Sequence, residues 1–291
     1  MKEKRCFNLI ELCVNAYNKL IAWDKQKKIV TMTTKEFLVK LSEDLKSLDL
    51  YSDFKLRKAD TRFIKKIDGG TIYAEFTHVT PWDEVVIYPI YCVRYDILHK
   101  WFEKFSFKTL KDQRNSSSKM ISGGSMGLPT HFYFNLDGSN YEEEFKKLAE
   151  VSDRCTKWVT EHLYPMDKLF ETVVLPYIKG EKEMPTGGAD WIFIYLGACK
   201  LVAPELYPKF KSIMLEHVKW MYERKEPNVE HYYDHMDEIL SYMEAYMEDP
   251  KNLKRQTVFQ PRSGVIVVNP GQFHARGHGQ EPHQLPRRGR S

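Results

Sequence analysis

Short apolar runs in the first half of the chain predict β-strands. Ile72, Ala74 and Phe76 fall on one face of a strand, whereas the run 84–93 is apolar on both faces, as in a strand covered on both sides. Asp68-Gly69 favours a tight hairpin, because a primed turn needs positive φ. We expect strands at 54–59, 61–68, 71–79, 84–93 and 131–136.

Apolar stripes with helical spacing predict helices before and after these strands. Leu41, Leu45 and Leu48 lie on one side of the first helix, and Thr33 and Glu36 have the spacing of a capping box at its start. Prolines mark the ends of several later helices. We expect helices at 34–50, 95–107, 141–163, 166–178, 191–203, 210–224 and 229–247.

Strands that come first and helices that follow are typical of an α+β fold. We predict an antiparallel sheet of four to five strands at about 54–136, packed with helices and followed by a mostly helical half at about 141–247. The polar segment 108–130 is predicted to be a long loop. We divide the chain into an extension at 1–31, a sheet region at 32–138, a helical region packed on it at 139–254, and a basic Gly/Pro/Arg/His-rich tail at 255–291. The extension is either an added short helix or upstream sequence joined to the core. The tail is either disordered or not native to the fold.

The net charge of +4 is unevenly distributed over the 291 residues. The segment 256–291 contains five arginines and one acidic residue, which leaves the preceding chain with 39 basic and 39 acidic residues. A neutral body argues against a large nucleic-acid footprint. Nucleic-acid binding through the arginines of the tail therefore remains as one alternative function.

The five cysteines are odd in number and widely spaced, with no C-x-x-C pair. This pattern indicates free thiols in a reducing compartment, and hence a cytoplasmic protein. The most apolar segment, Trp191–Ala203, is too short to span a bilayer, so we expect no membrane partner.

Residues 123–127 match G-x-S-x-G, the nucleophile elbow of α/β-hydrolases. The motif places a serine, here Ser125, on a sharp turn between a strand and a helix, with its hydroxyl exposed. In this chain a Ser/Asn-rich segment precedes the motif and a strand follows it, so the context does not fit. A hydrolase using Ser125 remains an alternative to a flexible loop.

His231 and His235 lie four positions apart (i and i+4) on a predicted helix, a spacing that lets two imidazoles converge on one metal ion. Both face away from the apolar stripe of that helix, and the first histidine lacks the following glutamate that zinc proteases use. Solvated surface histidines are the competing interpretation. We predict no cofactor, with a metal-dependent enzyme as an alternative.

Aromatic and basic residues at one end of the sheet form a candidate binding surface. Trp82, Tyr88 and Tyr91 lie on or beside predicted strands, while Arg94 and Arg114 flank the helix and the loop that follow. Such aromatic residues either pack in a core or bind a protein, because Tyr and Trp are enriched in interface hot spots. The arginines either line a cleft or form local pairs.

Five features follow one another between residues 52 and 112. They are Phe54-Lys-Leu-Arg-Lys, Thr61-Arg-Phe-Ile-Lys, the Asp68-Gly-Gly hairpin, the apolar strand ending in Val93-Arg94-Tyr95, and the helix at Ile97–Phe105. In this order they resemble a family of bacterial α+β proteins of unknown function, some of which are found near toxin–immunity loci. The resemblance implies a cytoplasmic bacterial protein of the immunity type. It carries no catalytic signature, so no site residues come with it.

These observations favour a non-enzymatic module, of the immunity or antitoxin type, that binds a protein partner. The motifs that would indicate catalysis each fail the test of their sequence context, whereas the body of the chain is neutral and rich in aromatic residues. The alternatives are a hydrolase or metal-dependent enzyme, and a nucleic-acid binder acting through the tail.

Overall fold

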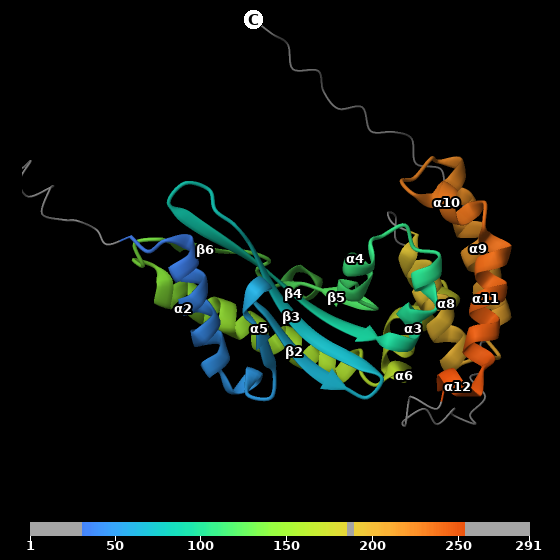
Figure 1. Ribbon diagram of the computed structural model, residues 1–291, viewed down its shortest axis with the longest axis horizontal. Helices are drawn as coiled ribbons and strands as arrows, with labels where there is room; N and C mark the ends of the chain where they lie inside the picture. Colours follow the sequence, from blue (N-terminus) through green and yellow to red (C-terminus); the bar gives the residue numbers. More distant parts are fainter. Residues whose placement is uncertain (1–30, 185–188, 254–291) are drawn as a thin grey trace, which may run out of the picture.

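The computed structural model describes residues 31–184 and 189–253. Within them six strands form one sheet in the order β1-β2-β3-β4-β5, and β6 also pairs with β4 (Figure 1). All pairs are antiparallel, so the predicted α+β class with an antiparallel sheet followed by helices is confirmed. The strands are β1 Lys55–Arg57, β2 Arg62–Ile67, β3 Gly70–Val79, β4 Glu84–Tyr95, β5 Lys119–Ile121 and β6 Phe132–Asn135.

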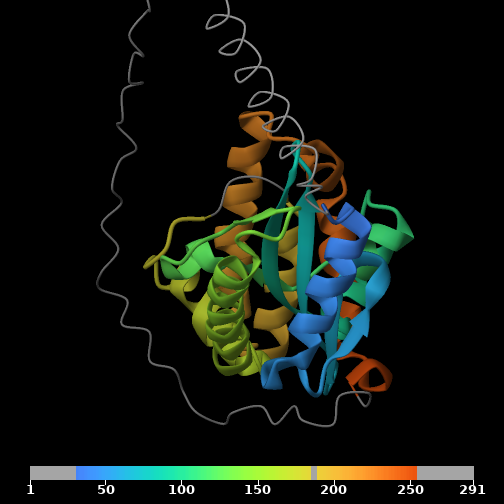
Figure 2. The same ribbon diagram turned by 90° about the vertical axis from the view of Figure 1, so that its left-hand side faces the viewer.

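Two helices cover one face of the sheet, which we call the inner face (Figure 2). The helix α2, Thr34–Ser47, begins at the predicted capping box: the Glu36 amide donates to the Thr33 hydroxyl over 3.2 Å, and the Glu36 carboxylate accepts from the Thr33 amide over 2.8 Å. The long helix α5, Tyr141–His162, lies against β3, β4 and β6. The inner face is apolar because alternate strand residues point towards these helices.

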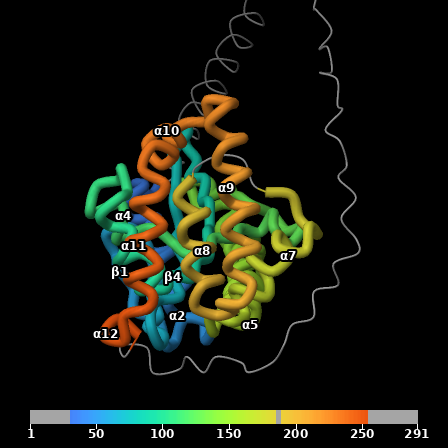
Figure 3. Tube along the Cα trace, turned by 90° about the vertical axis from the view of Figure 1, so that its right-hand side faces the viewer, coloured from blue at the N-terminus to red at the C-terminus, as the bar shows by residue number. Residues whose placement is uncertain are grey.

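The remaining helices form a lobe at one end of the sheet, where α8, α9 and α11 lie side by side (Figure 3). A short helix, α3 Asp96–Lys100, follows β4 directly and packs against α8. The elements of this half after α5 are α6 Met166–Leu169, the π-turn Phe170–Val174, α7 Leu175–Ile178, α8 Asp190–Val202, α9 Tyr207–Glu223, α10 Val229–Tyr233, α11 Met236–Glu248 and α12 Pro250–Leu253.

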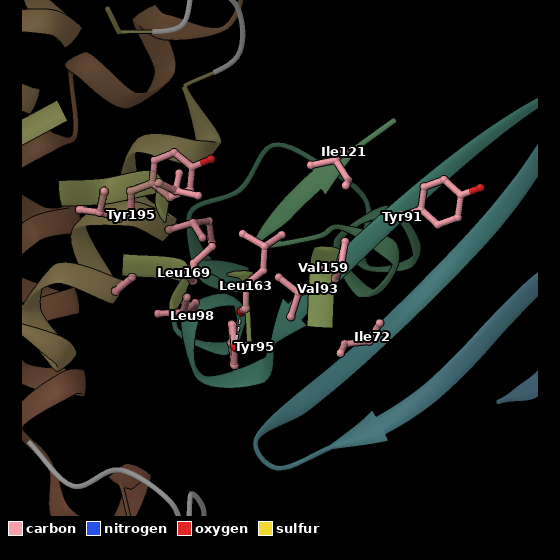
Figure 4. Packing of buried hydrophobic residues seen from close by; sticks show 14 of the residues in the cluster. Ile72, Tyr91, Val93, Tyr95, Leu98, Ile121, Val159, Leu163, Leu169 and Tyr195 are labelled. Atoms are coloured by element: carbon pink, nitrogen blue, oxygen red, sulfur yellow. Dashed lines mark hydrogen bonds between the residues drawn. The ribbon is translucent and has the colours of Figure 1, made fainter. Parts of the chain in front are cut away.

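Buried residues from the sheet and the helical half form one continuous cluster. At the join, the end of β4 packs against residues from α5 to α8 (Figure 4). The Tyr95 hydroxyl donates to the Leu163 carbonyl over 2.6 Å, which ties the last residue of β4 to the end of α5. The sheet is thus held firmly to both groups of helices.

The segment 108–130 is not the long loop that its composition predicted. It contains α4 Leu110–Asn115, the strand β5 and a 3-10 turn at Gly123–Met126. The Ser118 amide donates to the Val93 carbonyl over 2.8 Å, and β5 then pairs with β4. Ser116 and Ser118 form hydrogen bonds within the fold, so the polar composition of this segment does not mark it as a solvated loop.

Three helix predictions are also corrected. The helix expected at 95–107 ends at Lys100 and continues only as the 3-10 turn Phe102–Lys104. The helix expected at 229–247 is interrupted, since α10 ends at Tyr233 and α11 begins at Met236. The helix expected at 166–178 contains a π-turn just before Pro176, which has no amide hydrogen to continue the α-helical pattern. The predictions for the extension at 1–31 and the tail at 255–291 fall, apart from residue 31, outside the described residues.

Candidate functional site

The hairpin formed by β3 and β4 projects beyond β2 (Figure 1). Its strands pair from Gly70 opposite Tyr95 as far as Val79 opposite Val86, whereas β2 reaches only to the level of Glu75. At the tip, Trp82 has a φ of 54° and its residue surface is 96% exposed. A large aromatic side chain in a strained backbone conformation therefore stands in solvent.

The face of the sheet opposite α2 and α5, which we call the outer face, carries exposed apolar residues near this tip. The register places Val79 and Tyr133 in one row on either side of Val86, which is itself buried, with Tyr88 two residues further along β4. Val79 is 51% exposed, Tyr133 47% and Tyr88 39%. The uncovered face of an antiparallel sheet is ordinarily polar, so these residues are unusual there.

His131 connects two of these aromatic residues. Its ring centroid lies 5.9 Å from that of Tyr88 and 5.1 Å from that of Tyr133. Three rings, from β4, from β6 and from the residue before β6, are therefore held side by side at the surface, at spacings typical of packed aromatic pairs. We call Val79, Tyr88, His131 and Tyr133 the aromatic surface.

Further along, the outer face leads into a cleft of about 440 Å³. Ile90 and Cys92 of β4 and Tyr73 of β3 contribute strand residues to its lining, while α4 and α8 contribute Gln113 and Asp190. A cleft of this size lies within the usual range for ligand-binding pockets. The exposed Met120 of β5 also borders it, so apolar surface extends from the hairpin to the helical lobe.

A hydrogen-bonded histidine forms part of the cleft wall. His99 lies with Nε2 3.0 Å from Ser118 Oγ and Nδ1 3.1 Å from Ser116 Oγ. Ser118 Oγ also accepts from the Tyr95 amide, and the Ser116 hydroxyl donates to the Gln113 carbonyl. The network therefore assigns a tautomer in which Ser118 donates to Nε2 and Nδ1–H donates to Ser116.

The titratable side chains in this cleft are held uncharged where they are most buried. Burial, helped by the positive charges of Arg94 and Lys108, lowers the pKa of His99 well below its ordinary value. Burial raises the pKa of the Cys92 thiol to about 12. His99 is therefore a neutral ring with both nitrogens occupied, and Cys92 is a protonated thiol, so neither is prepared to act as a base or a nucleophile.

One acidic group of the cleft, that of Asp190, is also held by internal partners. The Asp190 carboxylate, at the start of α8, pairs with the Lys108 ammonium group and accepts a hydrogen bond from the Tyr232 hydroxyl. Burial and the neighbouring carboxylate raise the pKa of Tyr232, which keeps its hydroxyl protonated and donating. These contacts link the segment before α4 to α8 and α10.

Arg94 has a structural position, which corrects its prediction as a surface binding residue. Its residue surface is 8% exposed, and one Nη donates to the carbonyls of Gln113 and Ser116, each over 2.8 Å. It thereby fixes α4 and the following turn onto the end of β4. Arg114, the residue after Gln113 in α4, is exposed and does not line the cleft.

Tyr91 belongs to the core, so it is also removed from the predicted binding surface. It points to the inner face, is 1% exposed, and its hydroxyl lies 2.9 Å from that of Ser152 on α5. Tyr88, three residues earlier, points to the outer face, because side chains alternate along a strand. Trp82 and Tyr88 remain at the surface, as the binding hypothesis requires.

Ser125 lies in the 3-10 turn that follows β5, and not between a strand and an α-helix. It is exposed, and in the described part of the chain its hydroxyl forms no hydrogen bond to a histidine or a carboxylate. A serine nucleophile needs such a base within hydrogen-bond reach. The geometry therefore offers no support for a hydrolase at this serine.

The two histidines predicted to share a helix lie on either side of a helix break. His231 is in α10 and its Nε2 donates to the Phe105 carbonyl over 2.8 Å, whereas His235 precedes α11. Their ring centroids are 5.8 Å apart. Residues 31–184 and 189–253 contain no group of three or more His, Cys, Asp or Glu side chains that could hold a metal ion.

Sequence reasoning missed Val79, Tyr133 and His131 as surface residues and His99 as part of a cleft. Val79 and Tyr133 sit in strands with alternating apolar residues, where the sequence does not reveal which face the helices cover. His99 carried no motif, and its serine partners come from the segment predicted to be a loop.

The chain matches no family model, no curated protein and no solved structure. None of the helices in the described residues is long and apolar enough to cross a membrane.

Proposed function

We propose that this protein is a non-enzymatic module that binds another protein on the outer face of its sheet. The observation that carries the proposal is the aromatic surface near the hairpin tip that bears Trp82, on a sheet face that no helix of the described residues covers there. Contiguous exposed apolar residues on a soluble domain mark interaction sites. Tyrosine and tryptophan are the residues that most often dominate binding energy.

The arrangement of the outer face suits a partner better than a small substrate. The aromatic surface is open, and the cleft lies at the opposite end of the same face, so one ligand that spans both must be extended or large. A partner side chain could enter the cleft as an anchor while its neighbours cover the aromatic rings. Anchors in pockets surrounded by water-excluding contacts are typical of protein interfaces.

The chemistry of the cleft supports binding over catalysis. His99 is neutral with both ring nitrogens occupied, and the Cys92 thiol is protonated by virtue of its burial. The Asp190 carboxylate is paired with Lys108. Groups that already satisfy one another shape and rigidify a pocket, whereas catalysis needs a base or nucleophile with a free, reactive atom.

We extend the proposal to an immunity-type role in the bacterial cytoplasm. This part rests on the resemblance of residues 52–112 and on the free thiols. An immunity-type protein acts by forming a tight complex, and an exposed aromatic surface on a rigid sheet is suited to that task.

The test is affinity capture from the source organism with the full chain, followed by measurement of the dissociation constant of the purified complex. Trp82→Ala and Tyr88→Ala should each weaken the complex about 30-fold, the effect of losing a hot spot worth about 2 kcal/mol. Leu110→Ala is the matched control, because Leu110 is an exposed apolar residue on α4, away from the hairpin. Equal affinities for all three variants, or a wild-type chain that captures no stoichiometric partner, would refute the proposal.

A further inference from the structure

A second hollow lies on the other side of the β3–β4 hairpin, between β3 and α2. It has a volume of about 810 Å³. Leu38 and Val39 of α2 line one wall, Ala59 of the 3-10 turn Lys58–Asp60 lines one end, and Phe76 and His78 of β3 line the other wall. We call this hollow the edge groove.

The wall formed by β3 is an unpaired strand edge. β2 pairs with β3 only as far as Arg62 opposite Glu75, and the Phe76 amide then donates to the Thr61 carbonyl over 3.2 Å. Among the described residues no strand pairs with this side of Phe76–Val79, although β4 pairs with the other side. The free edge is four residues, or roughly 13 Å, long.

The backbone of this edge presents hydrogen-bonding groups to the edge groove. In an extended strand the N–H and C=O of one residue point to the same side, and the side alternates from residue to residue. Since the Phe76 amide points towards Thr61, the amide and carbonyl of His78 point the same way, past the end of β2. Exposed edges of this kind template the addition of another strand.

The charges around the edge groove favour an acidic occupant. Asp60 forms ion pairs with Arg57 and Arg62. Burial alone would raise the pKa of its carboxyl group, but the two arginines outweigh this effect and lower the pKa, so the carboxylate stays charged and paired. Glu75 is paired with Arg62.

Two lysines supply the remaining charge. Lys35 and Lys58 also line the edge groove, and neither forms an ion pair with any part of the chain that the structure describes. The acidic residues are thus neutralised and these two cations are not, so the edge groove carries a net positive charge towards an incoming chain.

We propose that the edge groove binds an extended acidic peptide segment of the partner protein, which adds to the sheet as a strand beside β3. This inference rests on the proposed function, since it states how part of the partner is held. Backbone hydrogen bonds to His78 would supply affinity, while alternate side chains would contact Leu38 and Val39. Acidic side chains of the peptide would meet Lys35, at the start of α2, and Lys58, in the 3-10 turn at the end of the edge groove.

The test uses the full chain and a fluorescein-labelled octapeptide that alternates glutamate and valine, with a lysine–valine octapeptide as the charge control. Fluorescence anisotropy should show saturable binding of the acidic peptide and at least tenfold weaker binding of the basic one. Hydrogen exchange should show the His78 amide becoming protected when the acidic peptide is added.

Two substitutions at one position isolate the backbone contact. His78→Pro removes the amide that faces the edge groove and should weaken peptide binding about fivefold, the effect of one lost hydrogen bond. His78→Ala keeps that amide and should bind like the wild type. The double variant Lys35→Glu, Lys58→Glu provides a test that leaves the strand untouched, and it should reverse the preference towards the basic peptide.

Several outcomes would overturn the inference. The first is that His78→Pro and the double lysine variant bind the acidic peptide as the wild type does. The second is that the free chain forms a dimer that His78→Pro dissociates, because the occupant of the edge groove would then be a second copy of the chain. A His78 amide that is already protected in the free monomer would assign the edge groove to a segment of the same chain. Partner capture that depends on Trp82 but not on His78→Pro would refute this inference alone and leave the proposed function standing.

Discussion

Replacement of Arg94 by methionine should destabilise the protein by about 3 kcal/mol. The guanidinium group is buried, and one Nη donates to the Gln113 and Ser116 carbonyls, each over 2.8 Å, and to Ser116 Oγ over 3.0 Å. Each of the two carbonyls loses a hydrogen bond from a charged donor, and such a bond contributes roughly 1.5–3 kcal/mol. The loss of two such bonds is partly offset by the free energy gained because a charge is no longer buried. The expected net decrease in the free energy of unfolding is about 3 kcal/mol.

The assay is urea denaturation followed by far-UV circular dichroism, with the free energy of unfolding obtained by linear extrapolation. Arg94→Lys is the informative comparison, because lysine keeps the charge but cannot reproduce the planar fork of donors. It should lose less than Arg94→Met, about 1–2 kcal/mol.

A loss below about 1 kcal/mol for Arg94→Met, with an unchanged denaturant slope, would show that the two carbonyls are solvated. The structural assignment of Arg94 would then be wrong, and this residue would again be a candidate for contact with a ligand.

Two further predictions concern a helix cap and a buried histidine. Thr33→Ala removes the acceptor of the Glu36 amide at the start of α2 and should cost about 1 kcal/mol in urea denaturation, whereas Thr33→Ser should cost little, and equal losses would contradict the capping role. The pKa of His99 is lowered in the folded state, so the unfolded chain binds more protons than the folded chain at pH values below the ordinary histidine pKa near 6.5. The free energy of unfolding should therefore fall as the pH decreases from about 6.5, by up to about 1.4 kcal/mol per pH unit. In His99→Gln this dependence should be weaker when stability is measured between pH 7.5 and 5.5, and an unchanged slope would assign it to other groups.

Local patterns in the sequence determined much of the secondary structure. The Asp68-Gly69 turn, the capping box of Thr33 and Glu36 and the strands either side of the hairpin are all present where the sequence predicted them. These features depend on neighbouring residues, through turn conformation, side-chain caps and alternation, so no distant contact is needed to infer them.

Features that depend on distant partners were not predictable in this way. The segment 108–130 is polar, but its serines bond to Arg94, Tyr95 and His99, which precede it by about twenty residues. A pattern of local polarity cannot distinguish internal hydrogen bonds from solvation. The break between α10 and α11 is of the same kind, since His231 reaches the carbonyl of Phe105, more than a hundred residues earlier.

For the candidate site, the sequence by itself determined the residue types and the alternation that separates Tyr88 from Tyr91 along one strand. Only the tertiary structure decided which of the two is exposed, because α2 and α5 cover one face of the sheet, whereas no described helix covers the other face near the hairpin tip. The free edge at His78 likewise arises because β2 ends opposite Glu75 while β3 continues. Burial and strand pairing are properties of the assembled layers, whereas periodicity is a property of each segment alone.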